Sequence, residues 1–349
     1  MNPEEIIKQC HRIKKVLVIK TNLLGDVLNF LPVVNFLGAE FKLEWLGWLV
    51  TETGYPVVKE LAKVDEILVL KNRFFYSWKN LYHLARWLKE KKPDLIVTSP
   101  QEECGLISTL ALLSRAPLRI GYNLRRRGWF FNIVVPKGSG QRRVELNGEI
   151  IRLLGGKLED YFYIPRADPE QEQSFFQKLE TEAGLKEGSQ YCVLHLFSSK
   201  RVKSWRWEYG EELILGIKNL GLIPIMVGSE PETRRWAEAR KNLGLINLAG
   251  QISLIELYYL LRRARLFIGI DSFPWQLTEF AGTQAIGLFG STKVWENRVP
   301  GAEVVKAEVE CAPCWPERME CELDYKCWRE LKPEQILAVA EKLLARVGA

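Results

Sequence analysis

The stretch that decides the fold runs from Asn247 to Pro300 and reads NLAGQISLIELYYLLRRARLFIGIDSFPWQLTEFAGTQAIGLFGSTKVWENRVP. Its apolar periodicity predicts, in chain order, a helix from Ser253 to about Arg262, a strand over Leu266–Ile270, a helix ending near Ala281 and a strand over Gln284–Phe289. A tight loop precedes the second helix, and Gly290-Ser291-Thr292 closes the second strand. Two apolar strands joined through a helix form a βαβ unit, so we expect an α/β fold with a parallel sheet.

The loop after the first of these strands has the features of an anion site. Asp271 and Ser272 follow the strand directly, where parallel sheets place their functional groups. The backbone N–H groups that open the next helix lack intrahelical partners and carry partial positive charge, which suits a phosphate. We therefore predict that Asp271 and Ser272 lie at the site of a nucleotide-sugar.

The same alternation of strands and helices extends along the chain. Further strands are expected at Val16–Lys20, Leu43–Trp48, Glu66–Leu70, Asp94–Thr98, Arg119–Tyr122, Asn132–Val135, Tyr191–Leu196 and Leu222–Val227, with a closing helix over Lys332–Val347. A charged, proline-containing segment, Ile164–Glu170, reads as a linker. The expected domains are therefore residues 1–165 and 166–349, two Rossmann-like domains facing a central cleft.

Composition narrows the class of protein. The 349 residues are 47% hydrophobic, enough for two cores, and no apolar run approaches the roughly 18 residues that span a bilayer. The charged start does not match a signal peptide, so we expect a cytoplasmic protein. A net charge of +6 is too small to indicate nucleic-acid binding. It fits either ordinary surface chemistry or attraction to phosphorylated substrates and to the inner membrane face as a peripheral contact.

Several segments together resemble glycosyltransferase family 9, the bacterial ADP-heptose:lipopolysaccharide heptosyltransferases and their relatives. They are VLVIKTNLLGDVLNFLP (Val16 to Pro32), LRIGYNLRRRGWFFNIVVP (Leu118 to Pro136), VLHLFSSKRVKSWRWEYGEEL (Val193 to Leu213) and the stretch quoted above, with G-x-D-S-x-P-x-x-L and A-x-x-L-F-G-x-T. The resemblance implies a GT-B fold and an inverting glycosyltransferase. It further implies a nucleotide-sugar donor, with ADP-heptose favoured, and an anionic glycan such as the lipopolysaccharide core as acceptor.

Asp26 is the candidate catalytic base. Leu24-Gly25-Asp26 follows the first predicted strand, at the carboxyl edge of its sheet. Inverting sugar transfer needs a base that takes the proton from the acceptor hydroxyl, and a carboxylate at that edge suits the task. The alternative is a plain helix N-cap, for which Asp is a favoured residue. The family resemblance favours the catalytic role.

Lys203, Ser199 and Glu232 are the further donor-binding candidates. Lys203 follows a strand by a polar loop and precedes Trp205, and the resemblance implies that this lysine contacts the donor phosphates. A fixed cation there stabilises the charge that develops on a departing diphosphate, and Ser199 adds a hydroxyl or N–H group. A carboxylate at Glu232 suits the ribose hydroxyls, with Glu230 as its competitor. The alternative for Lys203 is a solvated basic loop, and the alternative for Glu232 is a charge at the N-terminal end of a helix.

The sequence predicts metal-independent catalysis without a cofactor. No Asp-x-Asp motif occurs, and the three histidines lie far apart along the chain. The carboxylate pair that commonly holds a divalent ion on a nucleotide-sugar is therefore missing. Protein cations and helix termini would take over that task.

Arginines supply the candidate acceptor site. Arg119 lies in the R-I-G-Y segment, and Arg125 opens a triple arginine in the loop that follows. Arginine suits bidentate contact with phosphate. A solvated loop is the alternative for Arg125.

Four cysteines, Cys311, Cys314, Cys321 and Cys327, fall within one short excursion before the last helix. Their spacing suits a structural zinc or iron ion held by four thiolates. Free thiols and disulfides are the alternatives, and a cytoplasmic location disfavours disulfides.

Two residues depart from the family's D-S-G-P-x-H-L motif: Phe273 replaces the glycine and Gln276 the histidine. We expect Phe273 to crowd the turn or to stack on a sugar or base, whereas Gln276 can donate hydrogen bonds but carries no charge. These changes leave open a different sugar donor or a catalytically idle binding or assembly protein on the same fold. A family member with a protein acceptor is a further alternative.

Overall fold

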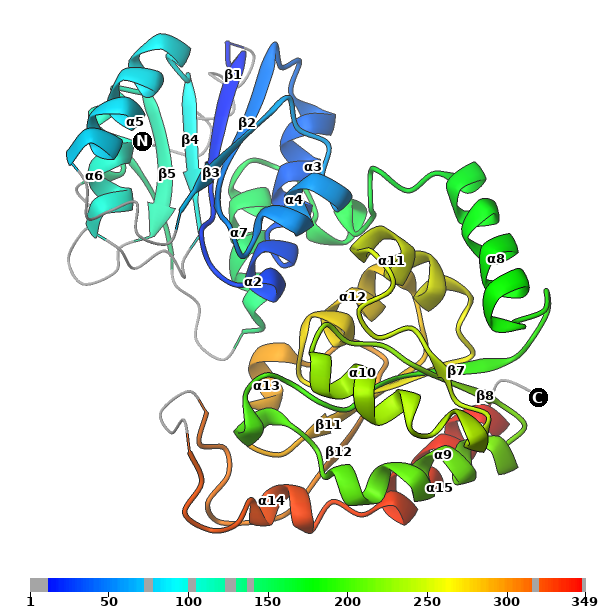
Figure 1. Cartoon of the computed structure of the whole chain (residues 1–349). Helices are drawn as coiled ribbons and strands as arrows, with labels where there is room; N and C mark the ends of the chain where they lie inside the picture. Colours follow the sequence, from blue (N-terminus) through cyan, green and yellow to red (C-terminus); the bar gives the residue numbers. More distant parts are fainter. Residues whose placement is uncertain are drawn as a thin grey trace. The chain divides into compact units, whose positions relative to one another are not determined.

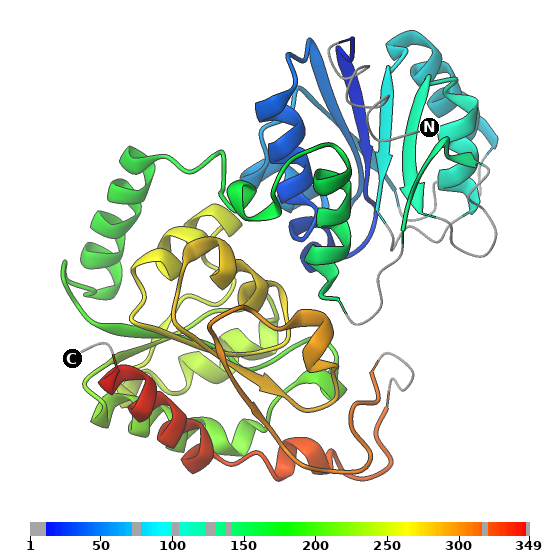
Figure 2. The same ribbon diagram turned by 180° about the vertical axis from the view of Figure 1, so that it is seen from behind.

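The computed structural model describes residues 12–71, 78–99, 105–122, 130–136, 141–315 and 320–346. The chain divides into two compact units, Met1–Arg166 and Ala167–Ala349 (Figure 1). Each unit is a parallel sheet with helices on both faces, seen from the opposite side in Figure 2. The expected α/β class and the two Rossmann-like domains are confirmed.

The first unit is built on a six-stranded sheet in the order β3-β2-β1-β4-β5-β6, with all neighbours parallel. Its strands are β1 (Lys15–Ile19), β2 (Trp45–Thr51), β3 (Glu66–Leu70), β4 (Leu95–Thr98), β5 (Leu118–Tyr122) and β6 (Ile133–Val135). Its helices are α2 (Leu24–Leu28), α3 (Leu31–Glu40), α4 (Tyr55–Leu61), α5 (Trp78–Lys91), α6 (Gly105–Leu113) and α7 (Arg143–Leu153).

The centre of this sheet forms because its strands are apolar on both faces. Val16 to Ile19 of β1 are all fully buried, as expected for a strand covered by helices on each side. Helices α5 and α6 cover one face, where Leu84, Leu88 and Leu110 pack into a cluster with Leu17 and Ile96. Helices α3 and α7 pack against each other on the opposite face.

The second unit repeats the architecture with the order β12-β11-β10-β7-β8-β9, again all parallel. Its strands are β7 (Tyr191–His195), β8 (Ile223–Met226), β9 (Ile246–Asn247), β10 (Leu266–Ile270), β11 (Ala285–Phe289) and β12 (Glu303–Lys306). Its helices are α8 (Pro169–Ala183), α9 (Gly210–Asn219), α10 (Pro231–Glu238), α11 (Leu254–Arg263), α12 (Phe273–Ala281), α13 (Val294–Asn297), α14 (Lys326–Arg329) and α15 (Pro333–Ala345). Helix α11 packs against α12, and α15 packs against α9.

In both units the first and fourth strands lie side by side at the centre of the sheet, and the chain winds outward from them in both directions. In the first unit these strands are β1 and β4, and in the second they are β7 and β10. Loops that leave two such strands diverge, and the crevice between them is the usual ligand site of an open parallel sheet. The fold thus marks one candidate site in each unit.

The predicted central strands are confirmed to within a few residues, but two edge strands, β9 and β12, were not predicted. Strand β9 has two residues, and three of the four residues in β12 are partly or fully exposed, so neither presents an apolar run. The predicted linker is too long, because Pro169 and Glu170 already belong to α8, which Asp168 caps by accepting from the Glu170 N–H at 2.8 Å. Among the residues described, no helix has the length and apolar character that a bilayer-crossing segment needs.

Candidate functional site

The central crevice of the second unit is defined by its topology, as the point where the loops that follow β7 and β10 diverge. The β7 loop carries Lys203 at the end of a single 3-10 turn, Arg201–Lys203. The preceding residue, Val202, is buried, and its carbonyl accepts from the Ser291 hydroxyl at 2.8 Å and from the Trp328 indole N–H at 2.7 Å. Two buried donors therefore fix the backbone beside Lys203, whose own side chain is half-buried.

A hydroxyl bridge closes the same loop on itself. Ser204 Oγ accepts from the Ser198 N–H at 2.8 Å and donates to the Ser198 carbonyl at 2.9 Å. Ser199, the predicted phosphate contact, sits at the exposed tip of this loop. The structure therefore places Lys203 and Ser199 on one braced loop at the carboxyl end of β7.

The β10 loop brings Asp271 and Ser272 to the same crevice. Asp271 is 4% exposed, and its Oδ2 accepts from Asn297 Nδ2 at 3.0 Å. Ser272 Oγ donates to the Ile270 carbonyl at 3.0 Å and makes no side-chain cap to α12. Asp271 thus holds the loop through its contact with Asn297. The Ser272 side chain does not cap the backbone N–H groups in the first turn of α12.

Phe273 is the first residue of α12, at the turn where the sequence led us to expect crowding or stacking. Its ring is 9% exposed, and the two residues that follow it, Pro274 and Trp275, are buried as well. Little of the ring is left to stack on a sugar or base, so the departure from glycine is accommodated by core packing. Gln276 lies one turn further along α12 and is half-buried.

The third loop of this crevice follows β8. Glu232 is exposed and pairs with Arg235 at 3.1 Å, and Glu230 is the residue that precedes α10. Behind them Thr233 is 1% exposed, and its hydroxyl has no hydrogen-bond partner within the described part of the chain. Gly228 has a φ of +152°, which side-chain-bearing residues rarely adopt, and a Cβ there would lie 3.2 Å from Thr233 Cγ2, so a substitution at Gly228 would be strained.

His195 is a site residue that the sequence did not single out. It ends β7, is 8% exposed, and its Nδ1 lies 3.2 Å from the Val227 carbonyl. Since a carbonyl only accepts, Nδ1 carries the proton in this contact. Burial lowers the pKa of His195 to about 4, with a smaller lowering from the charge of Lys203. A neutral imidazole therefore stands beside the Lys203 cation.

In the first unit Asp26 lies in the first turn of α2, in the chain segment that leaves β1. The helix N-cap is Leu23, so the alternative interpretation of Asp26 as a plain N-cap is wrong. Its carboxylate is 12% exposed and accepts from Arg143 Nη1, the first residue of α7, at 2.8 Å. The sequence did not predict this partner, because 117 residues separate the two positions.

Arg119 lies at the amino end of β5 rather than at the edge that carries Asp26. Its guanidinium donates to the Phe130 carbonyl at 2.9 Å and to the Ala116 carbonyl at 2.6 Å. These bonds give Arg119 a structural task, and its contact with an acceptor stays a prediction. Arg125, the other predicted acceptor residue, lies outside the described residues.

None of the four cysteines is in a disulfide bond, and the four lie close enough for the other three to act on the charge of Cys327. Burial raises the pKa of Cys327 to about 12, and Cys311, Cys314 and Cys321 raise it further by their charges. The Tyr325 N–H donates to Cys321 Sγ at 3.2 Å. Across the described ranges, however, no three His, Cys, Asp or Glu side chains are arranged to hold a metal ion. The metal site therefore stays a prediction.

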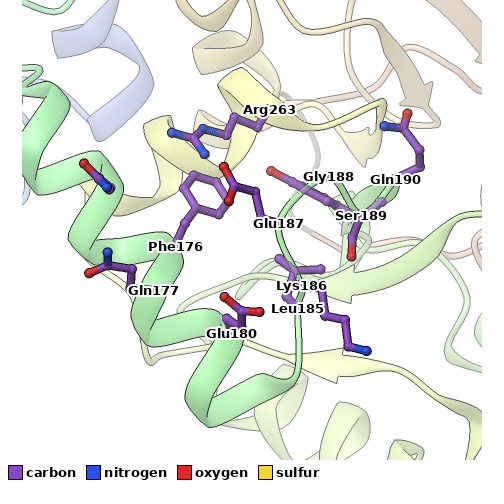
Figure 3. A pocket seen from close by; sticks show the side chains of 12 residues that line it. Phe176, Gln177, Glu180, Leu185, Lys186, Glu187, Gly188, Ser189, Gln190 and Arg263 are labelled. Carbon is purple, nitrogen blue, oxygen red and sulfur yellow. The ribbon is translucent and has the colours of Figure 1, made fainter.

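A cavity of about 200 Å³ lies at the other edge of the second sheet, between α8 and the start of β7 (Figure 3). Arg263 of α11 crosses its rim, with its guanidinium 4.2 Å from the Phe176 ring and 2.7 Å from Glu172. Parallel sheets bind their ligands at the carboxyl ends of the strands. The cavity is at the amino end of β7, so we do not assign the reaction to it.

Comparison with known proteins shows what the chain is similar to. Lipopolysaccharide heptosyltransferase 3 of Escherichia coli K12 is 23% identical over 335 residues, which cover 92% of this chain and 95% of the relative. The solved structure of E. coli heptosyltransferase WaaC with ADP has a TM-score of 0.69 at 19% identity, covering 94% of this chain and 99% of that one. The iron-containing dodecameric glycosyltransferase TibC from enterotoxigenic E. coli has a TM-score of 0.56 at 16% identity, covering 96% of this chain and 77% of that one.

The family model described as glycosyltransferase family 9 (heptosyltransferase) matches residues 81–324. That span includes all three loops of the crevice in the second unit and most of the cysteine excursion. The two Rossmann-like sheets agree with the fold of the solved relatives. The chain belongs to glycosyltransferase family 9.

Proposed function

We propose that the protein transfers heptose from ADP-heptose to a lipopolysaccharide-core glycan, with inversion at the anomeric carbon. The observation that carries this proposal is the meeting of two features at the centre of the second sheet. Lys203 stands on the loop after β7, and α12 opens after β10 without a side-chain cap from Ser272. A cation on one loop and a helix N-terminus on the neighbouring loop together suit a nucleoside diphosphate. The names of the relatives support heptose and lipopolysaccharide, and the ADP complex of one supports adenine.

On the donor side, Lys203 and the first turn of α12 bind the diphosphate, with Ser199 and Ser272 as neighbours. Glu232 reaches the ribose hydroxyls from the loop after the second strand of this unit, the position that an acidic residue occupies in dinucleotide sites. Asp271 acts indirectly, since its carboxylate accepts from Asn297 and holds the β10 loop in shape. No divalent ion takes part, because these donors neutralise the leaving diphosphate.

On the acceptor side, Asp26 is the base. Its carboxylate takes the proton of the acceptor hydroxyl while that oxygen forms the bond to the anomeric carbon. The bond from the anomeric carbon to the diphosphate breaks at the same time, and the electron pair leaves with the nucleoside diphosphate. Arg143 holds the Asp26 carboxylate in position through the ion pair at 2.8 Å. Arg119 and Arg125 remain proposed contacts of an anionic acceptor.

We also propose that the four cysteines hold a structural zinc or iron ion. Thiolates satisfy either metal, and four of them leave no open position for a substrate. The iron in the solved TibC relative is consistent with this assignment. Binding an ion would require the four thiols to converge further than they do in the structure.

The competing function is a binding protein on the same fold that performs no transfer. It is favoured by the departures at Phe273 and Gln276, and disfavoured by Asp26 and Lys203, which both remain. A protein acceptor or a different sugar donor would also be compatible with this fold.

For the location of the protein we propose the cytoplasm, with a peripheral contact at the inner membrane face.

Calorimetry with ADP, UDP, GDP and CMP, each with and without EDTA, tests the donor assignment. We expect ADP to bind most tightly and EDTA to leave its affinity unchanged. Lys203→Ala should weaken ADP binding, and the difference from the wild type should shrink at high salt because the contact is ionic. A strict requirement for magnesium or manganese, or an unchanged ADP affinity in Lys203→Ala, would contradict the proposed donor site.

A further inference from the structure

The described parts of the cysteine excursion, residues 309–315 and 320–329, are bound to the Lys203 loop by buried contacts with the backbone. Ser291, which is fully buried, joins the two segments. Its carbonyl accepts from the N–H groups of Cys314 and Trp315, both at 2.9 Å, and its hydroxyl donates to the Val202 carbonyl at 2.8 Å. Ser291 therefore bridges the backbone at Trp315 and the backbone at Val202, the residue that precedes Lys203.

Trp328 makes a second, independent link from the excursion to the same carbonyl. Its ring is 1% exposed, and its indole N–H donates to the Val202 carbonyl at 2.7 Å. A Cβ on Gly290 would come within 2.4 Å of this ring, so the turn after β11 lies directly against it. Val202 is therefore fixed by one donor from the β11 turn and one from the excursion.

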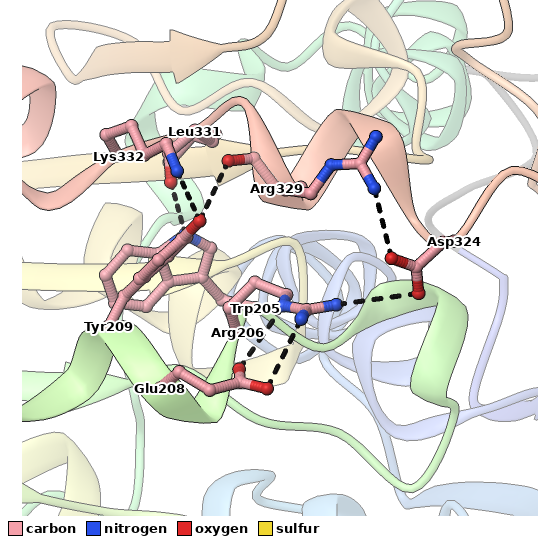
Figure 4. A network of polar contacts seen from close by, with 8 residues as sticks. All are labelled: Trp205, Arg206, Glu208, Tyr209, Asp324, Arg329, Leu331 and Lys332. Atoms are coloured by element: carbon pink, nitrogen blue, oxygen red, sulfur yellow. Dashed lines mark hydrogen bonds and ion pairs between the residues drawn. The ribbon is translucent and has the colours of Figure 1, made fainter.

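A wider polar network continues this attachment along the loop (Figure 4). The Trp205 indole N–H donates to the Leu331 carbonyl at 2.8 Å, and Arg206 Nη1 lies 3.9 Å from Asp324. Further along, the Tyr209 hydroxyl donates to the Arg329 carbonyl at 3.1 Å. The segment from Val202 to Tyr209 is thus attached to the excursion and to the chain that follows it.

Two cations of the loop lie over aromatic rings of the excursion. The Lys203 ammonium is 5.8 Å from the centroid of the Trp315 ring, and the Arg201 guanidinium is 4.9 Å from that of Tyr325. A tryptophan face attracts a cation within about 6 Å, so the Lys203 contact lies at the outer limit of that range. Trp315 therefore meets the functional end of Lys203, while its own backbone is fixed at Ser291.

We propose that Trp315 is a positioning residue for Lys203, so that the cysteine excursion contributes to the diphosphate site through this ring. The proposal rests on the donor role of Lys203 given above. A lysine side chain loses rotamer entropy when it is held in one place. A ring beside the ammonium removes part of that freedom before the ligand arrives, and preorganisation of this kind raises affinity.

The test is a double-mutant cycle on ADP affinity, measured by calorimetry on the full chain. The cycle uses the wild type, Trp315→Ala, Lys203→Ala and the double variant. Trp315→Ala should weaken ADP binding about 2- to 5-fold, as expected for a partly exposed cation–π contact. In the Lys203→Ala background the same change should have almost no effect, because only coupled residues depart from additivity.

Two more variants separate positioning from damage to the fold. Trp315→Phe keeps a ring beside the ammonium and should restore most of the wild-type affinity. Leu323→Ala truncates a 50% exposed side chain on the same excursion and should leave the affinity unchanged. Thermal unfolding of every variant checks that each is folded when it is titrated.

The outcomes separate the positioning role of Trp315 from the donor-binding role of Lys203 on which it rests. No ADP binding by the wild type, or an unchanged affinity in Lys203→Ala, would overturn the donor site and this inference together. An intact Lys203 effect with unchanged or tighter binding in Trp315→Ala would overturn the inference alone. An equal loss from Trp315→Ala in both backgrounds would overturn it as well, because the ring would then act without Lys203.

Discussion

Acid stability gives a quantitative test of the arrangement around His195. The imidazole is buried at the end of β7 beside Lys203, and its pKa is lowered from 6.5 to about 4. The folded protein therefore keeps His195 neutral at a pH where the unfolded chain has already bound a proton. We replace it by His195→Asn, because the side-chain amide can still donate to the Val227 carbonyl and does not titrate.

The size of the effect follows from this lowering of the pKa. Above pH 6.5 the imidazole is neutral in both states, so it adds no pH dependence to stability. As the pH falls from 6.5 to about 4, the unfolded state gains the proton and the folded state does not. One pH unit corresponds to about 1.4 kcal/mol, so this residue lowers the free energy of unfolding by about 3 kcal/mol over that interval.

The measurement is urea unfolding of both proteins at several pH values between 7 and 4. Carboxylates also titrate in this range, but they do so in both proteins. The difference between the two free energies of unfolding therefore isolates the contribution of His195. We expect the wild type to lose about 3 kcal/mol relative to His195→Asn across the range. Parallel pH profiles for the two proteins would refute the reasoning.

Two further predictions concern the turn after β11 and the cysteines. Gly290→Ala should lower the free energy of unfolding by about 1–3 kcal/mol, since the new methyl meets Trp328 at 2.4 Å and that ring is held by its bond to Val202. Gly38→Ala on α3 is the matched control, because its new methyl group would meet only Leu46, at 3.8 Å. Equal losses of stability in urea unfolding for the two variants would contradict the packing described for Gly290. Protein purified without added metal should contain about one zinc or iron ion per chain by elemental analysis; a content near zero with four titratable thiols would favour free cysteines.

The sequence was sufficient for the central strands and for the loops that leave them. β1, β7 and β10 are continuous apolar runs because helices cover both of their faces, and such runs are visible without a structure. Asp26, Lys203 and Ser272 lie in the segments that directly follow these strands, at the carboxyl ends of the sheets. Edge strands β9 and β12 lack this signal, because part of each is exposed to solvent.

The contacts that support the site could not be predicted from the sequence. Arg143 pairs with Asp26 from α7, and Trp328 donates to Val202 across 126 residues. Such partners meet only when the sheet and its helices are assembled, so local patterns do not indicate them. The sequence also could not show that Phe273 is buried with Trp275 in α12, since the family motif gives only the residue type at that turn.

The central claim is that Asp26 is the base of an inverting sugar transfer, and one comparison tests it most directly. Wild type and Asp26→Asn are each given ADP-heptose with a lipopolysaccharide-core acceptor that lacks the terminal heptose, and the release of ADP is followed over time. We expect Asp26→Asn to turn over about 10²–10⁴-fold more slowly, the usual loss for a missing general base. Its affinity for ADP should match that of the wild type, because the donor residues lie in the other unit. Equal turnover by the two proteins would contradict the account.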